Sequence, residues 1–411
     1  MENVIKINRQ SNIDLPIIRS RKSILEVTKR RVTSAMFALV AVCLLRIFLF
    51  SSIFTQFGVL EIIFDPLCAV IVLCGMLSAW RQINKKIRSA WICMMFFIAI
   101  AYLLHPSAGT HICNLTVFLG VLTLLPFTDL KHADIKWILS AYVIYVLIIA
   151  FLGPKFGEDA SNSIININTN LSSTIMLCFF IIILTKINFD KKNKLLYLIL
   201  LIIPIICIIS FKGRSSIVSV LMIVIYFLGK KFFDRIKPNK IGLLVVALCV
   251  FSVIFAYVYS TVLVDLFGSN IVIFGKNLFT GRQSIWAPVF ERFDEIGLFG
   301  YGNRFDVGYD YLPSMHNVML TMLVDFGCIA TFFYVILLAL IMTKLGKILK
   351  SKFLIAFILI FLLKTIFEGD FLADWTISHI CISIILIFSF SKKRANNLLT
   401  TMRPAKYRYG K

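Results

Sequence analysis

Long apolar runs separated by short polar linkers fill the chain from residue 32 to residue 390. A run of about 20 apolar residues can cross a bilayer as a helix. Because backbone groups in lipid must bond within their own segment, repeated runs of this kind predict an all-α polytopic membrane protein with about twelve transmembrane helices. We place the spans at residues 32–50, 59–80, 90–104, 110–127, 137–152, 171–185, 195–211, 215–228, 241–263, 318–342, 353–367 and 375–390.

The charges of the linkers alternate along the chain, so that every strongly basic linker falls on one side of the membrane and the acidic linkers fall on the other. Cytoplasmic loops of membrane proteins carry an excess of these residues, so twelve spans put both termini in the cytoplasm. The net charge of +22 therefore orients the chain, and we expect no nucleic-acid partner. The predicted parts are a basic cytoplasmic arm, nine spans, a large external loop, three spans and a basic cytoplasmic tail, at residues 1–31, 32–263, 264–317, 318–390 and 391–411.

Composition agrees with a membrane class and offers little for a metal. Hydrophobic residues make up 59% of the chain and charged residues 16%, against about 25% charged in a typical soluble domain. The basic first 31 residues do not resemble a signal peptide. The 10 cysteines form no CxxC pair and no Cys/His cluster, so we expect neither a disulfide framework nor a metal site, and no cofactor.

The large external loop has a helical pattern of its own. Aromatic and aliphatic residues recur there at helical spacing, at Trp286, Val289, Phe290, Phe293 and Ile296. The pattern predicts a short helix that either lies in the membrane interface or packs on the outer rim of the bundle. The glycines that follow, at 297, 300 and 302, allow sharp turns and close backbone approach.

Three cationic or titratable residues reach the same predicted membrane face: Arg214 at the start of a span, Arg282 in the loop and His316 at the mouth of the next span. Polar side chains at membrane depth are costly and often functional. Each residue alone also has a structural explanation, because an arginine can extend its charge to the interface and a histidine can cap a helix. Their meeting on one face favours a functional site.

Other ionisable residues lie within the spans. We expect Arg46 and Lys364 to extend toward the outer interface, although Lys364 can instead pair with Glu368 one helical turn later. His111 and His379 lie near outer span ends, where we expect structural roles.

Short motifs around these residues resemble one family of membrane enzymes. They are Gly213-Arg214-Ser215-Ser216, then Thr280-Gly281-Arg282 followed by Trp286, then Leu298-Phe299-Gly300-Tyr301-Gly302, and finally His316-Asn317 with Leu320 and Phe326-Gly327. This pattern resembles the O-antigen polymerase and ligase family of bacterial polysaccharide assembly. The motifs cover about residues 200 to 345.

The resemblance implies a GT-C-like fold and an inverting glycosyltransferase at the outer face of the bacterial cytoplasmic membrane. The donor would be an oligosaccharide on a polyprenyl diphosphate carrier, with membrane lipid around it and with a flippase and a chain-length regulator as possible partners. A polymerase extends the repeat units of O-antigen, capsule or exopolysaccharide, whereas a ligase transfers the polymer to the lipid A core of lipopolysaccharide.

The resemblance also implies roles for the motif residues. Arg214 and Arg282 would bind the diphosphate, because guanidinium forks match phosphate oxygens. His316 would either orient the diphosphate or accept the proton of the acceptor hydroxyl. The residues expected to line the substrate site are Gly213, Ser215, Gly281, Trp286, Gly300, Gly302 and Asn317. A carboxylate base is a further alternative, among Glu291, Asp294, Asp306, Asp310 and Asp325.

Other classes of protein must be weighed against this family. Enzymes that use sugar nucleotides commonly hold a metal-bound diphosphate through a DxD motif, which does not occur in this chain. A secondary transporter or flippase of lipid-linked sugars also has about twelve spans, but such proteins often show paired internal repeats. We find no clear repeat, so a polymerase is favoured, then a ligase.

Overall fold

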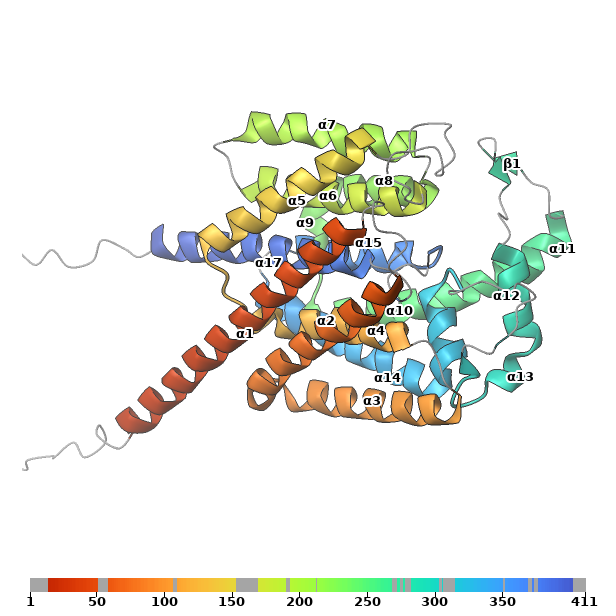
Figure 1. Cartoon of the computed structure of the whole chain (residues 1–411), viewed down its shortest axis with the longest axis horizontal. Helices are drawn as coiled ribbons and strands as arrows, with labels where there is room; N and C mark the ends of the chain where they lie inside the picture. The colour runs from red at the N-terminus through yellow and green to blue at the C-terminus, as the bar shows by residue number, and fades with distance from the viewer. Residues whose placement is uncertain are drawn as a thin grey trace, which may run out of the picture.

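The chain folds into a bundle of helices with one small hairpin (Figure 1). The structure is a computed structural model, and it describes residues 14–50, 58–105, 109–152, 169–189, 193–211, 213–267, 272–273, 276–277, 282–302, 305, 315–349, 352–368, 372 and 376–401.

The first half of the chain forms six long helices: α1 (Asp14–Phe50), α2 (Gly58–Ala79), α3 (Lys85–Leu104), α4 (Gly109–Leu124), α5 (His132–Leu152) and α6 (Thr169–Phe189). Short 3-10 turns follow α2 and α4, at Trp80–Gln82 and Leu125–Phe127. The sequence predicts that the first span begins at residue 32, but α1 begins at Asp14 and includes basic residues before position 32. Pro16 lies in its first turn, where a missing N–H costs nothing.

The second half begins with α7 (Lys194–Ser210), α8 (Arg214–Leu228), α9 (Lys230–Phe233), α10 (Pro238–Tyr257), the π-helix Val258–Val262 and α11 (Leu263–Phe267). The loop then forms β1 (Val272–Ile273), β2 (Lys276–Asn277), α12 (Arg282–Glu291) and α13 (Phe293–Ile296). The two strands pair antiparallel, with Val272 opposite Asn277. The chain ends with α14 (Val318–Ile348), α15 (Phe353–Lys364) and α17 (Thr376–Thr401), which continues into the predicted tail.

Eight helices of the described chain are long and apolar enough to cross a membrane. Four other apolar helices have 10–17 residues: Lys194–Ser210, Ser215–Leu228, Phe353–Lys364 and Thr376–Ser391. Even 17 residues rise only about 25 Å, less than the roughly 30 Å hydrocarbon core. Each of these helices overlaps one predicted span, and the number of twelve crossings stays a prediction.

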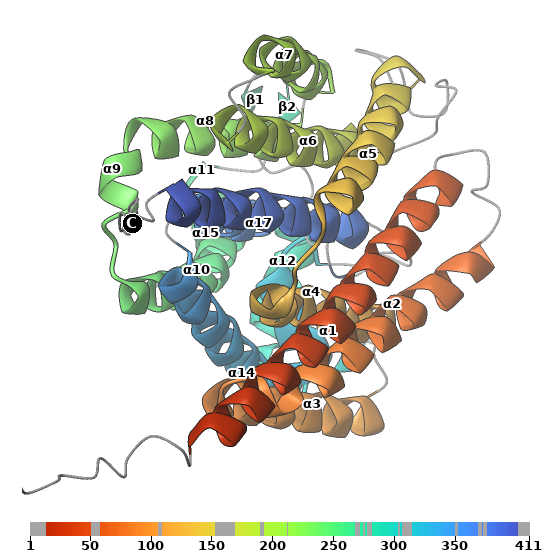
Figure 2. The same ribbon diagram turned by 90° about the vertical axis from the view of Figure 1, so that its left-hand side faces the viewer.

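Three helices form the interior of the bundle. Residues 114–124 of α4, 171–183 of α6 and 376–390 of α17 are buried on every side. Each of these helices carries apolar residues of its own on all faces, which is the pattern of a buried helix. Around them, α3, α7 and α10 expose many large apolar side chains, as helices in contact with lipid do. Figure 2 shows α17 running between the α6–α8 side and the α1–α4 side.

The loop elements gather at one end of the bundle. In Figure 1, α11, α12, α13 and β1 lie together on the right, whereas the start of α1 and the end of α17 lie on the left. The predicted external loop and the two termini are therefore at opposite ends of the molecule.

Candidate functional site

The loop helix packs on the bundle through its apolar face. Trp286, Val289 and Ile296 are buried in one cluster with Tyr259 of the π-helix and Val324 of α14. The structure thus selects the outer rim from the two predicted positions of this helix. The predicted single helix is divided into α12 and α13 at Arg292.

A break divides α14, which the sequence predicts as one span. Gly327 has φ 76° and ψ −178°, so residues 318–326 and 328–348 are separate helical parts. The backbone of the glycine-rich segment 297–302 fills this break. Tyr301 N donates to Val324 O at 2.7 Å, Cys328 N to Gly297 O at 3.4 Å, and Ile329 N to Leu298 O at 3.3 Å. The backbone N–H and C=O groups of α14 that lose their helical partners at Gly327 therefore form hydrogen bonds with the loop. Buried backbone groups need such partners.

Two glycines allow this contact. A Cβ atom on Gly327 would lie 2.3 Å from the carbonyl oxygen of Leu298, and one on Gly300 would lie 2.7 Å from the Asp325 backbone. Gly300 and Gly302 have φ of 81° and 71°, values that favour glycine. The expected sharp turns and close approach are confirmed. Contact of Gly300 and Gly302 with a substrate stays a prediction.

Asn317 and His316 have different roles at the start of α14. The side-chain oxygen of Asn317 accepts from Met319 N at 3.0 Å and Leu320 N at 3.1 Å, so Asn317 is the N-cap. Its amide nitrogen donates to Ile366 O at 3.1 Å, which joins α14 to the end of α15. His316 is therefore not the cap. It has φ 49°, rare for a residue other than glycine, and such strain occurs often at functional sites.

Trp286 ties the loop helix to this strained turn. Its Nε1 donates to the carbonyl oxygen of Met315 at 2.6 Å, and the Trp286 side chain is fully buried. The centre of its ring lies 5.3 Å from that of Tyr259. The orientation of α12, which begins at Arg282, is thus fixed relative to His316.

The electrostatics of His316 place two charges near it. Burial lowers the pKa of His316, the positive charge of Arg282 lowers it further, and the negative charge of Glu368 raises it. The ordinary value is about 6.5, so the neutral imidazole is favoured at pH 7. The positive charge of Arg282 is thus close enough to influence the pKa of His316, as expected for two residues predicted to share one face.

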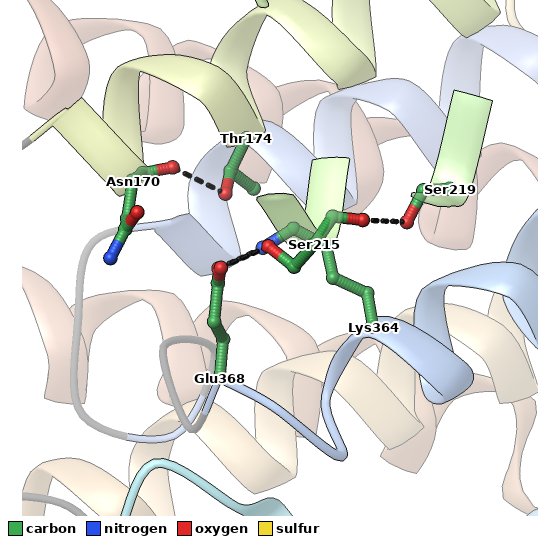
Figure 3. Close-up of polar contacts among 6 residues, drawn as sticks. All are labelled: Asn170, Thr174, Ser215, Ser219, Lys364 and Glu368. Carbon is green, nitrogen blue, oxygen red and sulfur yellow. Dashed lines mark hydrogen bonds and ion pairs between the residues drawn. The ribbon is translucent and has the colours of Figure 1, made fainter. Parts of the chain in front are cut away.

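Glu368 connects this region to the start of α8. Figure 3 shows Ser215 and Lys364 directed at its carboxylate. The Ser215 hydroxyl donates to Oε1, and Lys364 Nζ donates to Oε2. Lys364 and Glu368 are both only 4% exposed, so the predicted pair is confirmed and extension of Lys364 to the interface is wrong.

The first turn of α8 is closely packed as well. A Cβ atom on Gly213 would lie 1.8 Å from the Oγ of Ser173 on α6, so a glycine lets the two helices approach. Arg214 is the first residue of α8, and the next residue is Ser215. The Arg214 side chain and Gly281 lie outside the described residues. The start of α8 is thus linked to Glu368, and the segment of Glu368 is linked to Asn317, the residue after His316.

Three helices therefore begin around one group of polar residues. They are α8 at Arg214, α12 at Arg282 and α14 after Asn317. The N-terminus of a helix carries N–H groups without a helical partner and partial positive charge, which favours anions. At α14 these groups are already bonded, since Asn317 caps the helix and Val318 N donates to Thr365 O. The arrangement combines the starts of α8 and α12 with cationic side chains and a neutral histidine. It can bind an anion and accept a proton next to it.

The structure gives most of the predicted carboxylate bases other positions. Asp325 is buried and pairs with His111 across α4 and α14, with 2.5 Å between Oδ2 and Nδ1. Glu291 and Asp294 are exposed, and Asp306 and Asp310 lie outside the described residues. Sequence reasoning missed Glu368 as a site residue, because it sought carboxylates in the loop and saw Glu368 only as a partner of Lys364.

Two further buried polar groups lie in the bundle. Arg46 of α1 is 1% exposed, and its guanidinium contacts Asp65 of α2 at 2.7 Å. The expectation that Arg46 extends to the interface is wrong, since the bundle supplies a buried partner. His379 of α17 is fully buried and lies 3.1 Å from the hydroxyl of Tyr142. This contact, like that of His111, agrees with the structural roles expected for the two histidines.

Within the described residues, no three His, Cys, Asp or Glu side chains are grouped so that they could hold a metal ion. Comparisons of the chain with protein-family models, curated proteins and solved structures found no match. The resemblance to the O-antigen polymerase and ligase family therefore stays a prediction from the motifs, and the argument for an activity depends on the residues of the site.

Proposed function

We propose that this protein polymerises lipid-linked oligosaccharide repeat units at the outer face of the bacterial cytoplasmic membrane. It would transfer the glycan from a polyprenyl diphosphate carrier to a sugar hydroxyl of another repeat unit, with inversion at the anomeric carbon. The observation that carries this proposal is the strained backbone of His316, with φ 49°, in a turn that Trp286 Nε1 ties to α12, the helix that begins at Arg282. Burial and the charge of Arg282 lower the pKa of His316, which favours the neutral imidazole. Arg282 would bind the anionic leaving group, and His316 would accept the proton of the acceptor hydroxyl.

The leaving group is a membrane-anchored diphosphate, whose negative charge grows as the glycosidic bond breaks. Among the described side chains of this region, the cations Arg282 and Lys364 outnumber the carboxylate of Glu368. Guanidinium forks bind phosphate oxygens through paired, charge-assisted hydrogen bonds. The starts of α8 and α12 add N–H groups of the same polarity.

The reaction balances with one base. The acceptor hydroxyl oxygen attacks the anomeric carbon on the face opposite the diphosphate. The bond from that carbon to the diphosphate oxygen breaks, and its electron pair leaves with the diphosphate. His316 takes the hydroxyl proton and later releases it to water. A neutral imidazole can act in this way because burial and Arg282 lower its pKa.

Two alternatives share features of this site. An O-antigen ligase would use the same donor chemistry with lipid A core as the acceptor. A flippase or transporter is favoured by the break in α14, because transporter sites are often built from discontinuous helices. The strained histidine and the tied loop lie at one end of the bundle, which suits chemistry at a membrane face better than a midplane transport site.

Reconstitution tests the proposal. Purified protein given lipid-linked repeat units should form a ladder of polymers and release polyprenyl diphosphate, and it should do so in excess chelator. A deletion strain should attach single repeats to their final acceptor without long chains. Long polymer left on the carrier would establish a ligase instead. Repeat units trapped at the inner leaflet would establish a flippase.

A further inference from the structure

We propose that Glu368 is a positioning residue of this site, whose carboxylate holds the first turn of α8 against the end of α15, next to the turn that carries His316. The inference rests on the proposed function in naming the reaction that Glu368 serves. Its physical content, a carboxylate that holds the first turn of α8 next to the turn of His316, can be measured without that reaction.

The contacts of Glu368 come from two helices far apart in the sequence. Ser215, the second residue of α8, is separated from Glu368 by 153 positions, and Lys364 lies one turn before it at the end of α15 (Figure 3). Ser215 directly follows Arg214, so a shift of this turn would move the backbone that carries Arg214. A second bond holds the same turn, since the Ser219 hydroxyl donates to Ser215 O at 2.8 Å.

Both carboxylate oxygens of Glu368 are used as acceptors. An ionised carboxylate has two acceptor oxygens and no donor, which fits one hydroxyl and one ammonium group. A glutamine in its place would turn an amide N–H₂ group toward either Ser215 or the Lys364 ammonium. An aspartate would keep the charge, although it is one methylene shorter. The two substitutions therefore separate the charge of Glu368 from its reach.

The charge also acts on His316. Asn317, the residue after His316, donates at 3.1 Å to the backbone carbonyl oxygen two residues before Glu368, so the segment of Glu368 packs against the turn of His316. Arg282 at the start of α12 and Glu368 after α15 both influence the pKa of His316. Lys364 faces Glu368 and partly screens it. Burial and Arg282 lower the pKa of His316, and Glu368 opposes them. Without the carboxylate charge, burial and Arg282 lower the pKa of His316 unopposed by Glu368, so this pKa falls further.

Chemical modification measures this effect without any turnover. Diethyl pyrocarbonate reacts with neutral imidazole, so the rate of His316 modification against pH, followed by mass spectrometry of the loop peptide, gives the protonation midpoint. In Glu368→Gln this midpoint should move to lower pH, and in Glu368→Asp it should stay close to that of the unchanged protein. Polymerisation by Glu368→Gln should fall about tenfold or more, as expected when a hydrogen bond to a charged group is lost. The acid limb of its pH profile should shift in the same direction as the midpoint.

Glu295→Gln provides the matched control. Glu295 accepts from Arg292 at 2.6 Å in a partly exposed pair on α13, away from Ser215 and Lys364. The same change there should leave the His316 midpoint unaltered. An unmoved midpoint in folded Glu368→Gln, or an equal shift in Glu295→Gln, would overturn the proposal. If the unchanged protein makes no polymer, the proposed function fails, while the His316 titration still decides the role of Glu368.

Discussion

Two regions of this molecule contain buried charged side chains, and they differ in the balance of positive and negative charge. Between α1 and α2, Arg46 and Asp65 form one pair whose side chains are 2% and 3% exposed. At the loop end of the bundle, the described side chains near His316 include two cations, Arg282 and Lys364, and one carboxylate, Glu368. The first region balances one cation with one anion. The second gathers more positive charge than its own carboxylate can neutralise.

The difference separates structural from functional buried charge. A balanced pair needs no ligand, because each ion already has its partner. An excess of one sign at the starts of several helices favours a ligand of the other sign. Burial alone would mark both regions as candidate sites. The balance of charge, and the backbone strain at His316, indicate only the second.

The largest expected effect is on stability, at the balanced pair. Arg46→Met leaves Asp65 buried without this partner, and breaking a buried pair in this way costs about 3–5 kcal/mol. Thermal unfolding in detergent should show that loss, whereas polymerisation per folded molecule should be unchanged. The double variant Arg46→Met with Asp65→Leu should recover most of the stability. A double variant that is stable but inactive would place this pair in the site and remove the contrast.

The sequence predicts the apolar framework well because that framework is local. Runs of apolar residues locate the helices, since each needs only its own composition to favour lipid or a buried position. Glycines 297, 300 and 302 likewise mark a turn through their own conformational freedom. The pair Lys364 and Glu368 is one helical turn apart, so helical spacing alone suggests it.

Features that depend on packing between distant segments are not visible in the sequence. Asp65 lies on a different helix from Arg46, and only their packing shows that Arg46 has a buried partner. The break at Gly327 requires the loop backbone that fills it. Ser215 reaches Glu368 across 153 positions, so no local pattern could assign Glu368 to the site.

Substitutions in the second region, at the loop end of the bundle, should lower the activity of the protein more than its stability. A guanidinium makes two aligned bonds to phosphate oxygens, whereas lysine offers a single compact charge. Arg282→Lys should therefore keep the protein level and lose a charge-assisted contact worth about 1.5–3 kcal/mol, which is roughly ten- to a hundredfold in rate. Arg282→Ala should lose more.

Chain-length distribution at matched expression measures the effect of Arg282→Lys. Arg292→Lys is the control, because Arg292 lies in the same loop but pairs with Glu295 at the surface. That variant should make chains of normal length. Near-normal chains in Arg282→Lys would remove Arg282 from the site and leave only interfacial packing as its role.

The smallest expected effect compares one hydrogen bond at the loop end with one inside the helix bundle, away from the site. Trp286→Phe removes the bond to Met315 O, and Trp91→Phe removes the bond from Trp91 Nε1 to Thr123 Oγ1, 3.1 Å long and buried between α3 and α4. Each should lower the free energy of unfolding by about 0.5–1.5 kcal/mol, the net worth of a typical hydrogen bond. Only Trp286→Phe loosens the turn before His316, so it alone should also slow polymerisation, by less than the loss in Arg282→Lys. Thermal unfolding and polymer yield per folded molecule measure both variants, and equal activity in the two would mean that the bond to Met315 supports the fold without positioning His316.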